Sequence, residues 1–121
     1  MRTKVIDIGI YKTNLTIFLG GRYADISVWL KENISDDEEE CRVLTEQFYG
    51  TFYENNANGA FAFYKRDFFV WVRHANSVSE LVHELYHATN YILTQCGVAH
   101  DEIDEPYAYL LEYLTREALK K

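Results

Sequence analysis

Two histidines and a glutamate stand at a spacing that suits metal-assisted chemistry. His83, Glu84 and His87 form the pattern His-Glu-x-x-His. Side chains four residues apart lie on one face of a helix, so both imidazoles can reach a single ion. Two histidines, one further ligand and a water make a catalytic zinc arrangement. The glutamate beside the first histidine can accept a proton from that water, so the pattern predicts hydrolysis with Glu84 as the base.

A site of this kind needs a third protein ligand, and the residues after the motif offer several. Glu105 stands 18 residues after His87, at the start of the next expected helix, which a turn can bring back beside the first. We therefore expect Glu105 to be the third ligand, although a carboxylate at a helix start can also serve the helix dipole alone. The alternative ligands that the spacing leaves open are Asp101, Glu102 and Asp104.

Tyr109 follows Glu105 by one helical turn and shares its face of the expected helix. Its hydroxyl could donate a hydrogen bond to the oxyanion that develops on a substrate at the metal. A tyrosine at this position could equally be a core aromatic. We expect a catalytic role for Tyr109 beside that of Glu84.

The residues around the motif predict the helix that carries it. Ser77 and Glu80 have the spacing of a capping box, and Gly97 suits the end of a helix, so we expect a helix over residues 78–96. Its apolar side chains fall on one face, and the two motif histidines fall on the opposite face. Such a helix can pack on a sheet and turn its histidines toward a cleft or, less specifically, toward water.

The rest of the chain predicts a small sheet with further helices. Strands are expected at residues 4–11, 15–19, 60–64 and 68–73. The last two strands are apolar on both faces, which indicates that helices cover the sheet. Further helices are expected at residues 24–33, at residues 36–48, and from Asp104 or Glu105 to the C-terminus with Pro106 in the first turn. We predict an α+β fold of about four strands over residues 1–121 as one domain, with the C-terminal helix completing the metal site.

Composition excludes several other classes of protein. The chain has 121 residues, 48% of them hydrophobic, and a formal net charge of −7, which is typical of one soluble globular domain. No apolar run approaches the ~18 residues that a membrane span needs, and no signal peptide is evident. The acidic balance argues against nucleic acid as the main partner. Cys41 and Cys96 have no metal-ligand spacing, and we expect two reduced thiols.

About half of the chain resembles small phage and prophage proteins that carry a zincin-like HExxH helix. The matching features are His83-Glu84-x-x-His87, Gly97-Val98, the segment 104–110 and Tyr113-Leu114. The larger kin would be the gluzincin metallopeptidases, including the minimal minigluzincin type. The resemblance implies a zincin-like fold, Zn²⁺ held by His83, His87 and Glu105, a peptide or protein substrate, and the cytoplasm of a bacterial host cell.

Two functions of different classes follow from these observations. The first is a zinc-dependent metallopeptidase, in which the segment from Phe68 to Arg73 is the expected edge strand that pairs with extended substrate. The second is a catalytically inactive zincin-fold phage protein that acts as a binding or assembly module. Glu84 favours the first, because a structural zinc site needs no adjacent base. A chain of 121 residues leaves little surface for a cleft, so a homo-oligomer or a phage or host protein partner is also expected.

Overall fold

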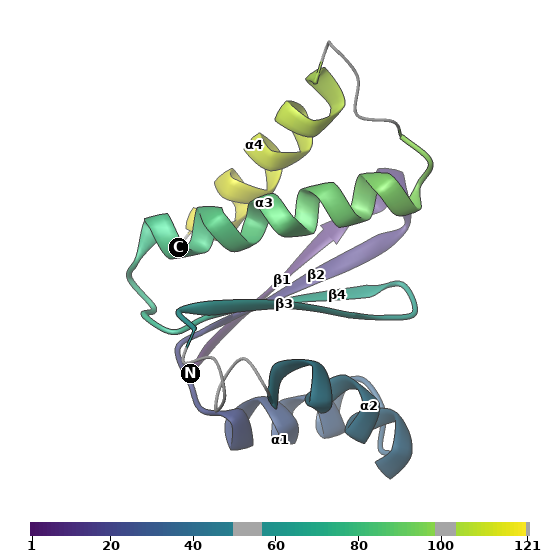
Figure 1. Cartoon of the computed structure of the whole chain (residues 1–121), viewed down its shortest axis with the longest axis vertical. Coiled ribbons are helices and arrows are strands. Elements are labelled where there is room, and N and C mark those ends of the chain that lie inside the picture. Colours follow the sequence, from purple (N-terminus) through teal and green to yellow (C-terminus); the bar gives the residue numbers. More distant parts are fainter. Residues whose placement is uncertain (50–56, 99–103, 121) are drawn as a thin grey trace.

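One four-stranded sheet lies between two pairs of helices (Figure 1). The computed structural model describes residues 1–49, 57–98 and 104–120, without the side chains of residues 48 and 49. The strands are β1 (Arg2–Ile8), β2 (Thr13–Leu19), β3 (Gly59–Tyr64) and β4 (Asp67–Val72), in the spatial order β1-β2-β4-β3. The central pair, β2 and β4, is parallel and both outer pairs are antiparallel, so the sheet is mixed.

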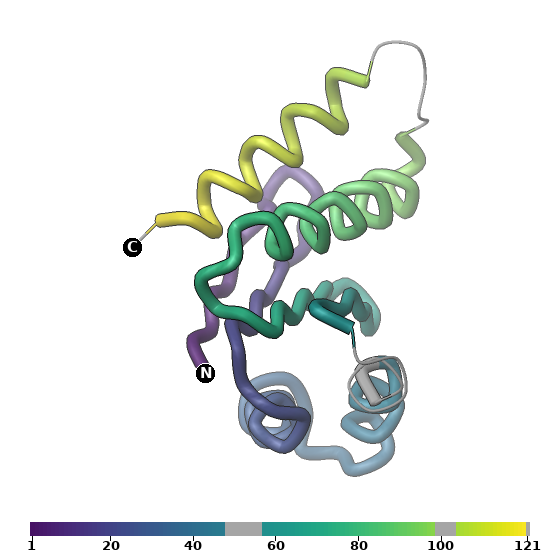
Figure 2. Tube along the Cα trace, turned by 60° about the vertical axis from the view of Figure 1, so that its left-hand side comes forward, coloured from purple at the N-terminus to yellow at the C-terminus, as the bar shows by residue number. Residues whose placement is uncertain are grey.

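The helices divide between the two faces of the sheet. One face carries α1 (Tyr23–Asn33) and α2 (Glu38–Tyr49), and the other carries α3 (Val78–Gln95) and α4 (Glu105–Leu119) (Figure 1). Figure 2 shows α3 and α4 as neighbours that run in roughly opposite directions. The α+β architecture, the four strands and the helical cover on both faces confirm the sequence-based expectation.

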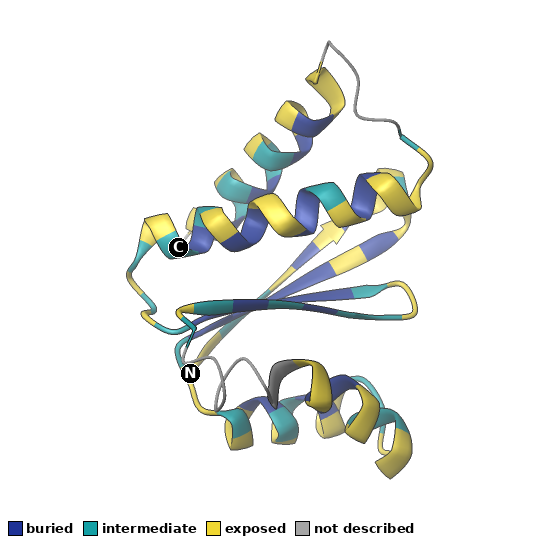
Figure 3. Cartoon of the chain, in the orientation of Figure 1, coloured by how far each residue is buried: buried dark blue, intermediate teal, exposed yellow. Residues whose placement is uncertain are grey.

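Alternation along β4 explains why both faces must be covered. Phe68, Val70 and Val72 pack into the core under α3 and α4, whereas Phe69 and Trp71 pack into the core over α1 and α2. Successive strand residues point to opposite faces, so an uninterrupted apolar strand supplies both cores. Figure 3 shows the result, with the buried side of each helix turned toward the sheet.

The structure corrects two expectations about the strands. The first strand ends at Ile8 because Gly9–Tyr11 form a short 3-10 helix (η1), which Lys12 ends in a left-handed conformation with φ 53°. The segment from Phe68 to Arg73 is not an edge strand, since β4 is bonded to β2 on one side and to β3 on the other. Its backbone groups are already paired, so it cannot add a substrate strand. The edge beside α3 belongs to β3.

The helix that carries the motif begins and ends close to the expected residues. The Ser77 hydroxyl accepts a hydrogen bond from the Glu80 backbone N–H at 3.3 Å. The Glu80 carboxylate does not complete the capping box and instead accepts bonds from His74, from its backbone N–H and its ring. At the far end Gly97 adopts φ 79°, and the Val98 N–H bonds to the Leu93 carbonyl, which terminates the helix.

Within the described residues, no helix combines the length and apolar character that a membrane crossing requires. Cys41 on α2 and Cys96 after α3 are free thiols on opposite faces of the sheet.

The packing of α1 under the sheet generates a stability prediction. Leu30 is fully buried, whereas Val28 on the same helix is 55% exposed. Leu30→Ala should lower the free energy of unfolding by about 2–5 kcal/mol, because it leaves a cavity in the core between the sheet and helices α1 and α2. Val28→Ala, the matched control, should change it by less than about 0.5 kcal/mol. Urea unfolding followed by circular dichroism measures both, and equal effects of the two variants would contradict this packing.

Candidate functional site

The two motif histidines lie together on the exposed side of α3. His83 Nε2 and His87 Nε2 are 3.3 Å apart, and the rings meet edge to face. Two nitrogens that bind one tetrahedral zinc at 2.0–2.1 Å would lie about 3.3–3.4 Å apart. The same separation also suits a hydrogen bond between a protonated and an unprotonated imidazole nitrogen. The pair therefore has the spacing for one metal ion without a change of rotamer.

Glu84 lies on the inner side of the histidines, between α3 and β3. It is 7% exposed, and its Oε1 is 4.0 Å from His83 Nε2. Burial raises the pKa of the Glu84 carboxyl above its ordinary value, and the nearby His83 opposes part of that rise. A raised pKa brings a carboxylate closer to the range in which a general base works near neutral pH.

Gly59, the first residue of β3, makes the space that Glu84 occupies. A Cβ at Gly59 would lie 2.7 Å from both Cγ and Oε1 of Glu84. Any other residue would therefore push the carboxylate away from β3 or separate the strand from the helix. Together Gly59, Glu84, His83 and their neighbours line a recess of about 400 Å³.

The turn between β4 and α3 fixes the strand against the start of the helix. Arg73 donates its backbone N–H to the Asn58 carbonyl at 2.8 Å and its Nε–H to the Ala57 carbonyl at 2.9 Å. The next residue, His74, lies with its Nδ1 2.8 Å from Glu80 Oε1 on the first turn of α3. These contacts connect the residues before β3 to the helix that carries the motif.

Within the part of the chain that the structure describes, the outer edge of β3 has no backbone partner beside the histidines and is closed farther along. The Asn58 carbonyl faces β4, so by alternation Gly59, Phe61 and Phe63 present their backbone groups to the outer edge. At Phe63 the Gln47 carboxamide bonds both the N–H, at 3.1 Å, and the carbonyl, at 2.7 Å, as a neighbouring strand would. Among the hydrogen bonds between described residues, none caps Gly59 or Phe61 at this edge.

The structure does not bring the expected third ligand to the histidine pair. Within residues 1–49, 57–98 and 104–120, no group of three His, Cys, Asp or Glu side chains could hold a metal ion. Glu105 is exposed in the first turn of α4, which packs on α3 and over β1, whereas the motif faces the β3 edge. Of the alternatives, Asp104 precedes the same helix, and Asp101 and Glu102 lie outside the described residues. The third ligand stays a prediction.

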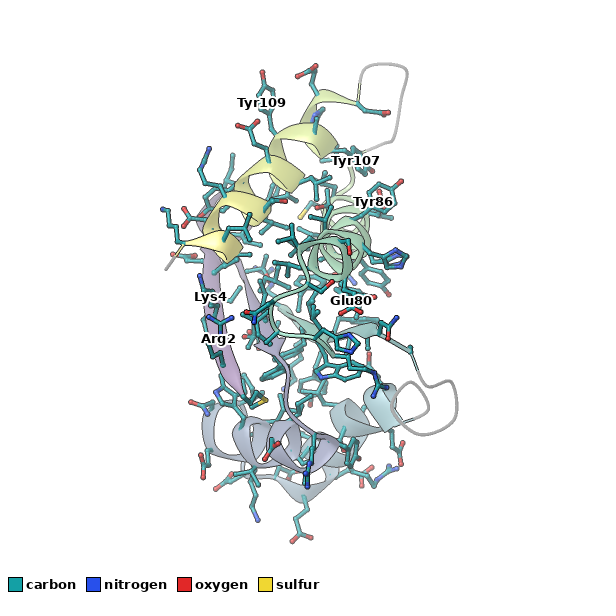
Figure 4. All side chains as sticks on the ribbon, turned by 90° about the vertical axis from the view of Figure 1, so that its left-hand side faces the viewer. Arg2, Lys4, Glu80, Tyr86, Tyr107 and Tyr109 are labelled. Atoms are coloured by element: carbon teal, nitrogen blue, oxygen red, sulfur yellow. The ribbon has the colours of Figure 1, made fainter. Side chains whose placement is uncertain are left out.

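Tyr109 likewise lies apart from the motif. It is 67% exposed and lines a pocket with the 3-10 helix after β1 and with other residues of α4. Figure 4 shows Tyr109 on the outer side of α4, away from Glu80 and Tyr86 on α3. Glu105, the predicted ligand on the same face of α4, is not beside the histidines either. A catalytic role for Tyr109 therefore also stays a prediction.

Comparison with known proteins adds no assignment. No family model, no characterised protein and no solved structure matches the chain.

Removal of the buried charge at Glu84 should stabilise the metal-free protein at neutral pH. An acid whose pKa is raised by folding costs stability once the pH exceeds its unfolded pKa, because the folded state disfavours the ionised form. In chelator-treated protein, Glu84→Gln should therefore unfold at higher urea than wild type at pH 7, and the difference should shrink below about pH 4. Glu32→Gln, an exposed control, should show no such pH-dependent difference. Equal stability of Glu84→Gln and wild type at pH 7 would show that burial of the ionised Glu84 carboxylate does not cost stability, contrary to this prediction.

The Gly59 contact predicts a coupling between strand and helix. Gly59→Ala should cost about 1–3 kcal/mol of stability by overpacking. The cost should fall substantially in a Glu84→Ala background, because the clashing atoms are gone. Gly9→Ala is the control, since a Cβ there would lie 3.9 Å from Asp7 Oδ1, an ordinary van der Waals distance. A double-mutant cycle by urea unfolding gives the coupling, and additive effects would exclude this contact.

Proposed function

We propose that the protein is a zinc-dependent hydrolase of peptide bonds with a zincin-like fold. The observation that carries the proposal is the histidine pair, whose nitrogens are 3.3 Å apart with the Glu84 carboxylate 4.0 Å from His83 Nε2. Two candidate metal ligands on one helix with a buried carboxylate beside them form the arrangement that metal-assisted hydrolysis needs.

His83 and His87 would hold the zinc ion, because their separation fits one tetrahedral ion and both are accessible. By the resemblance noted above, Glu105 would be the third ligand, with Asp101, Glu102 and Asp104 as alternatives. For Glu105 or Asp104 this requires that the start of α4 approach the motif more closely than it does here. When bound, zinc lowers the pKa of a coordinated water and polarises a substrate carbonyl.

Glu84 would act as the general base and then as the proton donor to the leaving amine. It lies beside the metal-binding nitrogens, and its burial raises its pKa and so its affinity for a proton. Gly59 keeps the carboxylate in this place, because no Cβ obstructs it.

The β3 edge would bind the substrate backbone. Gly59 and Phe61 present their outer N–H and carbonyl groups beside the motif, and the Gln47 carboxamide illustrates that this edge accepts strand-like bonds at Phe63. An extended peptide added here would run along α3, past Glu84 and both histidines. This mode of binding relies on backbone hydrogen bonds, and it replaces the β4 strand of the sequence-based hypothesis.

A second candidate is a binding or assembly module without turnover. The observation that favours it is the absence of a third metal ligand among the residues that the structure describes. In that case β3 would still capture an extended segment of a partner protein, and Glu84 would have no proton to move.

Metal content and hydrolysis separate the two candidates. Protein purified without chelators or a metal-binding tag should contain about one zinc per chain by elemental analysis, and His83→Ala should lose it. Glu84→Gln should keep the zinc and lose cleavage of a mixed peptide library by at least ~100-fold, the usual contribution of a general base. Glu112→Gln, an exposed carboxylate on α4, is the control and should retain both. Cleavage that survives in Glu84→Gln would exclude the mechanism, and a wild-type chain without metal would favour the binding module.

A further inference from the structure

A groove next to the motif is lined by aromatic and neutral polar side chains. It has a volume of about 530 Å³ and its lining residues are Phe61, His87, Asn90, Tyr91, Thr94 and Gln95. One wall is therefore a motif histidine and another is the edge strand that would bind substrate. The groove lies on the C-terminal side of the motif along α3, and the Glu84 recess lies on the N-terminal side.

The apolar wall of the groove is a fixed cluster of rings. Tyr91 on α3 lies with its ring centroid 5.3 Å from that of Phe61 and 4.6 Å from that of Phe63, both on β3. Tyr91 nevertheless remains 37% exposed, so part of its ring faces the groove. Packed aromatic side chains provide a rigid surface, and a further ring can stack on it with little loss of freedom.

The charge of the groove restricts what it can bind. None of the six lining residues is a carboxylate, an ammonium or a guanidinium group. A charged side chain would lose hydration there without gaining an ion pair. An aromatic side chain would bury its ring against Tyr91 and Phe61, and the polar side chains at the rim could bond its neighbouring backbone.

Spacing along β3 places this groove relative to the bond that the water activated by Glu84 would attack. Gly59 contacts Glu84, and Phe61, two residues on, contacts Tyr91. Two residues of extended chain span about 7 Å, and side chains two apart point to the same face. A peptide paired with β3 would therefore place one side chain over the groove within about two residues of the bond opposite Glu84.

We propose that this groove is a specificity pocket that selects an aromatic side chain within two residues of the scissile bond. The inference rests on the proposed peptide hydrolysis and adds to it the class of peptide that the site takes. Tyr91 is a binding residue in this proposal and has no part in proton transfer.

Peptide binding tests the pocket independently of turnover. The probe is a fluorescently labelled Gly-Ser peptide with one central Phe, compared with the same peptide carrying Ala, Glu or Lys. In the full-length Glu84→Gln protein, with and without added zinc, the Phe peptide should bind about tenfold more tightly than the other three. Tyr91→Ala in that background should remove most of this difference, and Tyr91→Phe should retain it. Tyr86→Ala, which removes another exposed tyrosine of α3 outside the groove, should also retain it.

Cleavage by the otherwise unmodified chain gives the second readout. A mixed peptide library should be cut with an aromatic residue enriched within two positions of the bond, and Tyr91→Ala should erase that enrichment. Equal binding of the Phe and Ala peptides, or the same loss in Tyr86→Ala as in Tyr91→Ala, would overturn the pocket. A preference for Phe that depends on Tyr91, without any cleavage by wild type, would support the pocket and count against the hydrolase.

Discussion

The close approach of α3 to the edge strand β3 is the contact on which the candidate site depends. It occurs at Gly59, where the missing Cβ leaves room for the Glu84 side chain. That packing buries the carboxylate while the histidines one position before and three positions after it stay exposed. A helix therefore presents two imidazole nitrogens to solvent and keeps a buried carboxylate behind them. The same approach lines the two recesses along the strand, where the proposed substrate would lie.

The sheet explains why α3 is positioned in this way. Apolar residues on both faces of β2 and β4 require helices above and below, and α3 covers the half of the upper face that ends at β3. The other half is covered by α4, where the Tyr113 hydroxyl bonds the Asp7 carbonyl of β1. This division leaves the motif facing the edge strand β3, and among the described residues neither Glu105 nor another carboxylate completes a metal site with the histidines. The β3 edge suits the extended peptide that we propose. A third ligand, which the described residues do not supply at the histidines, is the principal requirement of the proposed chemistry.

Much of the fold was predictable because its signals are local. An uninterrupted apolar run marks β4, the serine at position 77 and the glycine at position 97 mark the ends of α3, and four-residue spacing places the histidines on one face. The strand order was not predictable from such signals, and so β4 was wrongly taken for the edge. Gly59 and Gln47 were missed for the same reason, since their roles arise only when α2, β3 and α3 come together. We expected Glu105 near the histidines because a turn can bring the next helix back beside the motif. In the structure α4 does pack on α3, but it extends over β1 and not toward the motif.

The proposed hydrolysis depends on the binding of one zinc ion by His83 and His87 together. This binding can be tested by X-ray absorption spectroscopy of the zinc-loaded chain, recorded at the zinc edge. The spectrum reports the type of each ligand atom and its distance from the zinc. Shared binding by the two histidines predicts two imidazole nitrogens at about 2.0–2.1 Å, completed by oxygen ligands. A shell composed of oxygen alone, or a protein that takes up no stoichiometric zinc, would contradict it.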